Sequence, residues 1–140
     1  MDLRQFAQLV ISKTSGHRDV EIDGIFAQRV DSALVKIAKA TTPLKLIVHK
    51  SGNRRILRRV DRETYIVYPT KVKVTEETEI DIDDDLLDAA ALLVIAGLEP
   101  QKANLYIGLY YAELNAFNDN LSRNYEDSEY KATPLQRIFP

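Results

Sequence analysis

The segment that most constrains the fold is an almost continuous apolar run at residues 86–96, which reads Leu-Leu-Asp-Ala-Ala-Ala-Leu-Leu-Val-Ile-Ala. Wound as a helix, this run places apolar side chains around nearly its whole circumference, and such a helix is buried on more than one side. It is too short for a membrane span, which needs about 20 apolar residues. We therefore expect either the central helix of a core or a helix that a second copy of the chain partly covers.

Two helices are expected before this run. Residues 2–13 place Phe6, Leu9 and Val10 on one helical face. The next helix begins at Asp23, a suitable N-cap, and ends at residues 41–43. Its apolar side chains recur at steps of three and four residues: Ile22, Phe26, Val30, Leu34 and Ile37.

A β section is expected between the second helix and the apolar run, at residues 44–74. Its expected parts are, in order, an alternating strand at residues 44–48, a turn at 51–53, a returning strand at 56–60, a turn at 61–64, a strand at 65–68 that Pro69 ends, and a candidate fourth strand at 71–74. Together they predict a small antiparallel β-meander whose arginines lie largely on one solvated face.

A long helix is expected to follow the apolar run. Gly97 suits the position just after a helix end, and Pro100 suits the first position of the next helix. That next helix, at residues 101–121, forms an αα-hairpin with the apolar run. Its expected apolar stripe consists of Leu105, Tyr106, Leu109, Tyr110, Phe117 and Leu121.

These elements predict an α+β fold, in which a helical bundle of two N-terminal helices and a C-terminal αα-hairpin carries the inserted β-meander. Residues 1–121 are expected to form one domain, and residues 122–140 an extended C-terminal tail. The tail is polar but ends in three apolar side chains, the predicted partner-binding anchors Leu135, Ile138 and Phe139. Segments of this kind either order on a partner's surface or remain disordered.

The residue types that most catalytic sites need are scarce. The chain has no cysteine, and neither of its 2 histidines, His17 and His49, is spaced with another ligand as metal sites require. Neither a Gly-x-Ser-x-Gly motif nor a glycine-rich phosphate loop occurs. We therefore expect no enzymatic activity and no cofactor. The lack of cysteine fits a reducing compartment, and the first residues lack the apolar run of a signal peptide, so a soluble intracellular protein is expected.

The acidic residues 81–85 resemble a calcium site only in composition. Hard cations prefer clustered carboxylates, but this run lacks the central glycine and the distal glutamate of an EF-hand loop. Aspartates at a helix start also cap free N–H groups and complement the helix dipole. We interpret the run as helix capping and expect no metal site.

Charge is strongly segregated along the chain, although the net charge is only −2. The basic candidates for an interface or a DNA-facing surface are Lys50, Arg54, Arg55, Arg58, Arg59 and Arg62, and the acidic interface candidates are Glu76, Glu77, Glu79 and Asp81. Such polarity suits head-to-tail packing of copies or docking on a charged partner, and it equally suits two solvated faces.

The basic hairpin at residues 49–62 supports an alternative function, a small nucleic-acid-binding or regulatory protein. Arginines on a hairpin can contact phosphates without reading the sequence. The sequence pI of about 5.7 opposes this alternative, because dedicated DNA-binding domains usually carry a basic excess.

Over residues 25–121 the chain resembles the head–tail connector (adaptor or head-completion) proteins of tailed bacteriophages. The resemblance rests on the order of four features: a helix that ends at Thr42-Pro43, a β section that ends in Tyr-Ile-Val-Tyr-Pro at 65–69, the run Ile-Asp-Asp-Asp-Leu-Leu-Asp-Ala-Ala-Ala-Leu-Leu-Val-Ile-Ala-Gly-Leu at 82–98, and a helix with Lys-Ala-Asn-Leu-Tyr at 102–106 and Tyr-Tyr-Ala-Glu-Leu at 110–114. The β section is larger than the loop or hairpin of smaller connectors.

This resemblance implies a non-enzymatic virion structural protein, located in the neck region and assembled in the host cytoplasm. Copies form an oligomeric ring, commonly a dodecamer, that joins the portal protein to the tail or to a stopper protein and extends the DNA channel. Terminal tails grip neighbouring proteins, and oppositely charged surfaces meet between copies. The arginine hairpin would either contact DNA in the channel or dock on the portal protein. No membrane is involved.

Overall fold

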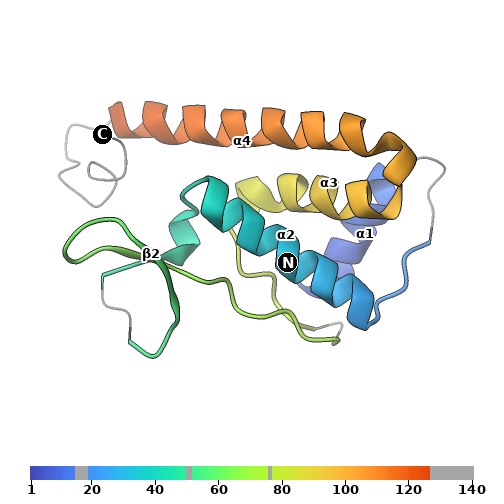
Figure 1. The fold of residues 1–140 in the computed structure, drawn as a ribbon, viewed down its shortest axis with the longest axis horizontal. Coiled ribbons are helices and arrows are strands. Elements are labelled where there is room, and N and C mark those ends of the chain that lie inside the picture. Colours follow the sequence, from blue (N-terminus) through green and yellow to red (C-terminus); the bar gives the residue numbers. More distant parts are fainter. Residues whose placement is uncertain (15–18, 50–51, 76, 127–140) are drawn as a thin grey trace.

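A computed structural model describes residues 1–14, 19–49, 52–75 and 77–126, and for residues 122–126 it describes the backbone alone. Within these residues it contains α-helices, short 3₁₀ helices and a three-stranded antiparallel sheet (Figure 1), which confirms the predicted α+β fold. The elements are α1 (Leu3–Lys13), α2 (Gly24–Ala40), η1 (Leu44–Leu46), β1 (Ile47–Val48), β2 (Ile56–Arg59), β3 (Tyr65–Val67), η2 (Asp84–Leu86), α3 (Leu87–Leu98), η3 (Pro100–Lys102) and α4 (Ala103–Glu126).

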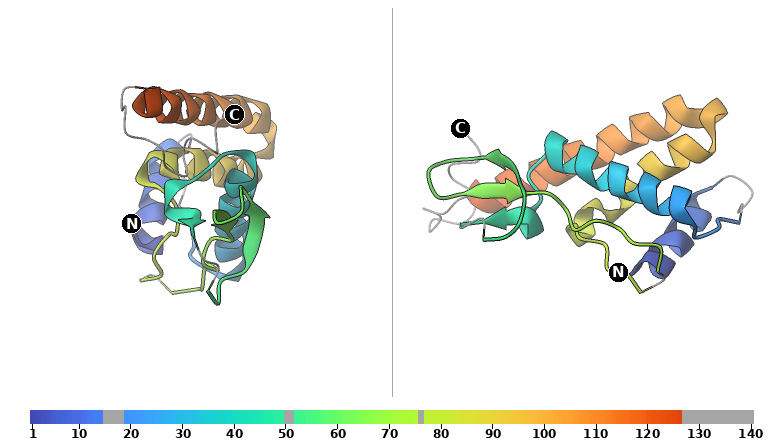
Figure 2. Two further views of the ribbon diagram at one scale, coloured as in Figure 1. Left: turned by 90° about the vertical axis from the view of Figure 1, so that its left-hand side faces the viewer. Right: turned by 60° about the horizontal axis from the view of Figure 1, so that its bottom comes forward.

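Helix α3 forms the centre of the helical bundle. It packs against α1, α2 and α4, and α4 covers it as an outer layer (Figures 1 and 2). The side chains of Ala89, Ala90 and Ile95 are 0% exposed. Cover for the apolar run therefore comes mainly from the chain itself, whereas Leu93 and Ala96 remain partly exposed.

Aspartate side chains cap the N-terminal ends of the first two helices. Asp2 caps α1 by accepting a hydrogen bond from the backbone of Gln5, whose own side chain accepts one from the backbone of Asp2. Asp23 caps α2 by accepting from the backbone N–H of Phe26, 2.8 Å away. At the C-terminal end of α2, the backbone N–H of Thr41 donates a hydrogen bond to the carbonyl oxygen of Ile37. The predicted start and end of this helix are confirmed.

The apolar stripe of α4 differs from the prediction. Its buried side chains are Tyr106, Tyr110, Leu114, Phe117 and Leu121. The predicted members Leu105 and Leu109 are 58% and 46% exposed. An α-helix turns by about 100° per residue, so these two leucines lie on a flank that α3 does not reach. The helix also continues to Glu126, beyond its predicted end at residue 121.

The sheet is antiparallel as predicted, but its strands pair in the order β1-β3-β2. β1 therefore pairs with β3 and not with β2. The predicted hairpin between residues 44–48 and residues 56–60 is wrong, because these two segments do not pair with each other. Ile66 and Val67 in β3 are 0% exposed, which suits a central strand, whereas the arginine-bearing β2 forms an edge.

Two other predicted strand segments take different structures. Residues 44–46 form the 3₁₀ helix η1, because a carboxylate caps their backbone N–H groups. Residues 71–74 form no strand. There the backbone N–H of Val72 is directed to the Asp31 carboxylate in α2, 3.4 Å away, and the side chain of Val72 is buried in the helical core. These residues run along α2 instead of joining the sheet.

Candidate interaction site

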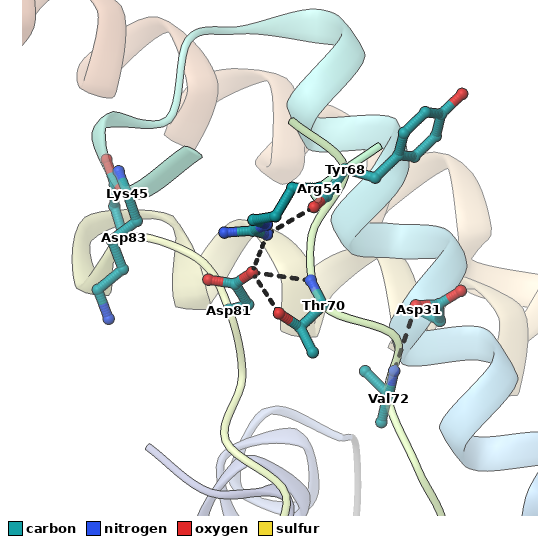
Figure 3. A network of polar contacts seen from close by, with 8 residues as sticks. All are labelled: Asp31, Lys45, Arg54, Tyr68, Thr70, Val72, Asp81 and Asp83. Atoms are coloured by element: carbon teal, nitrogen blue, oxygen red, sulfur yellow. Dashed lines mark hydrogen bonds and ion pairs between the residues drawn. The ribbon is translucent and has the colours of Figure 1, made fainter. Parts of the chain in front are cut away.

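The predicted basic and acidic interface residues meet within one chain at Arg54 and Asp81. Their charged groups are 2.8 Å apart, and Arg54 also donates to the carbonyl oxygen of Tyr68 at 2.7 Å (Figure 3). The same Asp81 oxygen accepts from the backbone N–H and the hydroxyl of Thr70, at 2.7 and 2.9 Å. This network joins the hairpin of β2 and β3 to the segment that leads into α3.

Arg58 attaches the sheet to the end of α2. Its guanidinium donates to the carbonyl oxygens of Lys39 and Thr41, at 3.2 and 2.9 Å, and to the hydroxyl of Thr42 at 3.2 Å. These bonds satisfy carbonyl groups that a helix end leaves without an intrahelical partner. Burial lowers the pKa of the Arg58 guanidinium from its ordinary value. Arg58 therefore has a structural role.

The remaining described arginines of the basic set lie in strand β2 or next to it in the chain. The Arg55 guanidinium lies 4.3 Å from the ring centre of Tyr68, and that of Arg59 lies 6.0 Å from the ring centre of Tyr65. Arg59 also donates to the carbonyl oxygen of Arg62 at 3.2 Å. Arg55, Arg59 and Arg62 are all exposed.

The described members of the predicted acidic set have different surroundings and do not form one acidic surface patch around Asp81. Glu79 forms an ion pair with the N-terminal amine of Met1 at 3.2 Å, next to the bridge between residues 2 and 79. Glu77 is exposed. Glu76 and Lys50, together with the tail anchors Leu135, Ile138 and Phe139, lie outside the described residues.

Asp83 is the buried carboxylate of the acidic run. It accepts hydrogen bonds from the backbone N–H groups of Leu44 and Lys45, at 2.6 and 2.7 Å. Figure 3 shows Asp83 beside Lys45. The sequence predicts capping by residues 81–85, but Asp83 caps the distant helix η1 and not the helix that follows it. Among the described residues, no group of three His, Asp or Glu side chains is close enough to hold a metal ion.

A groove of about 560 Å³ lies between α2 and α4, with α3 as its floor. Ile25, Ser32 and Lys36 line it from α2, Leu93 from α3 and Ile107 from α4. We call this surface the α2–α4 groove. The sequence analysis does not predict this groove. The available signal is that Ile25 and Ile107 are apolar but lie outside the predicted apolar stripes of their helices, where an apolar side chain is available for another contact.

Gly97 lets Arg29 lie across the floor of the α2–α4 groove. A Cβ atom on Gly97 would stand 2.2 Å from Nη1 of Arg29. The prediction that Gly97 follows the helix end is wrong, because α3 continues to Leu98. Here the glycine leaves room for a neighbouring side chain and does not end the helix.

A second exposed apolar surface lies along α4. It consists of Leu105, Leu109, Ala112 and Ala116, which are all exposed and follow one another at steps of four, three and four residues. Residues at this spacing share one helix face. We call this surface the outer stripe.

Comparison with protein-family models, with curated proteins and with solved structures gave no match. In the part of the chain that the structure describes, no helix combines the length and the apolar character needed to cross a membrane. Of the two histidines, His49 is exposed and His17 lies outside the described residues.

Proposed function

We propose that this chain is a non-enzymatic virion structural protein, copies of which form an oligomeric ring that joins the portal protein to the tail and extends the DNA channel. The observation that carries the proposal is the exposure of large apolar side chains on an otherwise tightly packed helical core. Ile25, Leu105 and Tyr111 are 64%, 58% and 53% exposed. Ile25 lies at the α2–α4 groove and Leu105 in the outer stripe, and exposed apolar patches of this kind are typical of protein–protein contacts. The exposed apolar surface supports assembly in general, and the resemblance to head–tail connectors is the reason for proposing a ring between the portal protein and the tail.

The sheet is the second part of the proposed assembly surface. Its arginines Arg55, Arg59 and Arg62 are exposed at one end of the molecule, where they would contact channel DNA or an acidic surface of the portal protein. The alternative of a dedicated nucleic-acid-binding protein has less support, because Arg54 and Arg58 are engaged within the chain.

The experiment that tests the proposal is a tagged pull-down from the native source, with nuclease-treated and untreated samples, followed by protein mass spectrometry. We expect a portal protein and tail components in both samples. Recovery of nucleic acid without virion proteins would contradict the connector function and favour the alternative.

A truncated chain that ends at Glu126 tests the role of the tail. This end point keeps the whole of α4, which a cut nearer residue 121 would shorten. We expect the truncated chain to keep its helical circular-dichroism spectrum and its cooperative unfolding but to lose the portal protein in the pull-down. Equal recovery of the portal protein with both chains would show that Leu135, Ile138 and Phe139 are not anchors.

A further inference from the structure

The α2–α4 groove and the outer stripe lie on opposite flanks of α4. Ile107, which lines the groove, lies two residues from both Leu105 and Leu109, and two residues correspond to about 200° around a helix. Helix α4 forms an outer layer on α3 (Figure 2). Leu105 and Leu109 are exposed and Ile107 is partly exposed, so both flanks are accessible in the described part of the chain. Each copy of the chain therefore carries two different apolar surfaces that face in nearly opposite directions.

The two surfaces also differ in charge. The groove is lined by Arg29 and Lys36. The outer stripe is bordered by Glu113, four residues after Leu109, and by Asp119, three residues after Ala116. Among the side chains that the structure describes, Lys102 is the basic one on this flank, and it lies at the N-terminal end of the stripe. The groove is therefore basic, and most of the stripe has an acidic border, so the two surfaces complement each other.

The shapes of the two surfaces fit as well. Leu105 and Leu109 project from the stripe, and Ala112 and Ala116 allow a second helix to approach closely. The groove volume of about 560 Å³ is in the range of sites that enclose a whole small ligand, so it can accept two leucine side chains. The floor of the groove includes Leu93, one of the residues that leave α3 partly exposed.

We propose that the outer stripe of one copy packs into the α2–α4 groove of the next copy. The contact is head-to-tail, because it uses different surfaces on the two partners, and repetition of such a contact closes into a ring or extends into a filament. The inference of a closed ring rests on the proposed function, whereas the contact itself follows from the two surfaces. Leu105 and Leu109 are its anchors, and Lys36 faces the acidic border of the stripe.

Disulfide trapping tests this contact directly, because the chain has no cysteine of its own. One variant carries Leu109→Cys on the outer stripe, and a second variant, with a tag of different size, carries Ser32→Cys in the groove. The full-length proteins are mixed at high concentration under mild oxidation. We expect mixed dimers to form at least about ten times faster than in a mixture of Asn115→Cys with Ser32→Cys. Asn115 is exposed on α4 but belongs to neither surface, so it reports random collision.

Other results of the trapping experiment would overturn the proposal. Predominant dimers of Leu109→Cys with itself would indicate a symmetric contact between two stripes. Mixed dimers no faster than in the Asn115→Cys control would show that the surfaces do not meet. Rapid intramolecular closure in a chain with both Ser32→Cys and Ile138→Cys would show that the groove holds the chain's own tail.

Charge substitution on the stripe gives an independent measure. In sedimentation experiments on the full chain, Leu105→Asp with Leu109→Asp should weaken self-association at least about tenfold, as expected for the loss of buried anchors. Asn104→Asp with Asn115→Asp adds the same charge elsewhere on α4 and should leave association unchanged. Equal association of the two variants would overturn the contact.

Portal-protein recovery in the pull-down tests the proposed function separately, because a chain that lacks the copy–copy contact can still bind the portal protein through its tail.

Discussion

Tyr110 carries a buried hydroxyl that lacks a hydrogen-bond partner in the part of the chain that the structure describes. Its side chain is 0% exposed. An unsatisfied buried polar group costs about 1–3 kcal/mol, so we expect Tyr110→Phe to raise the free energy of unfolding by roughly that amount. Tyr106→Phe is the matched control, because the hydroxyl of Tyr106 donates to Glu99 at 2.7 Å. That variant should be less stable, and denaturant unfolding measures both. A destabilised Tyr110→Phe chain would contradict the prediction.

The same residue makes stability depend on alkaline pH. Burial, and then the neighbouring Tyr111, raise the pKa of Tyr110 above its ordinary value of 10.0. Above pH 10 the unfolded chain releases this proton while the folded chain retains it, so this group lowers stability as pH rises, by at most about 1.4 kcal/mol per pH unit. Between pH 9 and 11, Tyr110→Phe should lose stability less steeply than the natural chain. Parallel curves would show that Tyr110 does not contribute.

Asp83 stabilises the start of the β section from a distance along the chain. Asp83→Ala removes both acceptors of the η1 backbone N–H groups, and hydrogen bonds to a charged group are worth about 1.5–3 kcal/mol each. We expect a loss of at least about 2 kcal/mol in the free energy of unfolding. The control Asp84→Ala changes an exposed neighbour and should stay within about 0.5 kcal/mol. Similar losses in both variants would show that charge, and not the cap, is responsible.

At the scale of elements, Arg58 links the sheet to the helical bundle. Arg58→Ala should free the carbonyl oxygens at the end of α2 and loosen β2 and β3 while the bundle stays folded. We expect amide hydrogen exchange in residues 56–67 to become at least about tenfold faster, as local opening becomes easier, with little change in α3. Arg55→Ala removes an exposed arginine from the same sheet and should have little effect. Unchanged exchange in the Arg58 variant would refute the link.

The helices could be predicted from the sequence because their apolar periods and caps are local signals. Asp23 indicates α2 directly, and the run at residues 86–96 indicates α3. Pro100 is predicted to begin the long helix, but it begins the 3₁₀ helix η3, and α4 follows from Ala103. The strand order and the exposure of Leu105 depend on which elements lie nearby in space, and local patterns do not contain that information. For the same reason the sequence could identify Arg54 and Asp81 as charged interface candidates but not as partners of one another.

At the scale of the whole molecule, the two apolar surfaces along α4 and the exposed arginines of the β section occupy different regions. The outer stripe and the groove flank α4, whereas the exposed arginines belong to the sheet at one end of the bundle (Figure 1). Contacts between copies and contacts with an anionic partner can therefore form at the same time. The proposed ring subunit requires such a separation, because the contact between copies has to persist while DNA moves past the arginines.

The sheet arginines allow a final prediction about DNA. With a net charge of −2, the isolated chain should retain DNA weakly, at low salt and without sequence preference, since each phosphate contact contributes about 0.9 to the salt slope. Arg55→Glu with Arg62→Glu should abolish that retention in a filter assay and leave thermal unfolding unchanged, because both side chains are exposed. Arg54→Glu would be a poor test, because it breaks the ion pair with Asp81 and disturbs the fold. Undiminished retention by the Arg55/Arg62 variant would exclude this surface as the DNA contact and leave docking on the portal protein as its role.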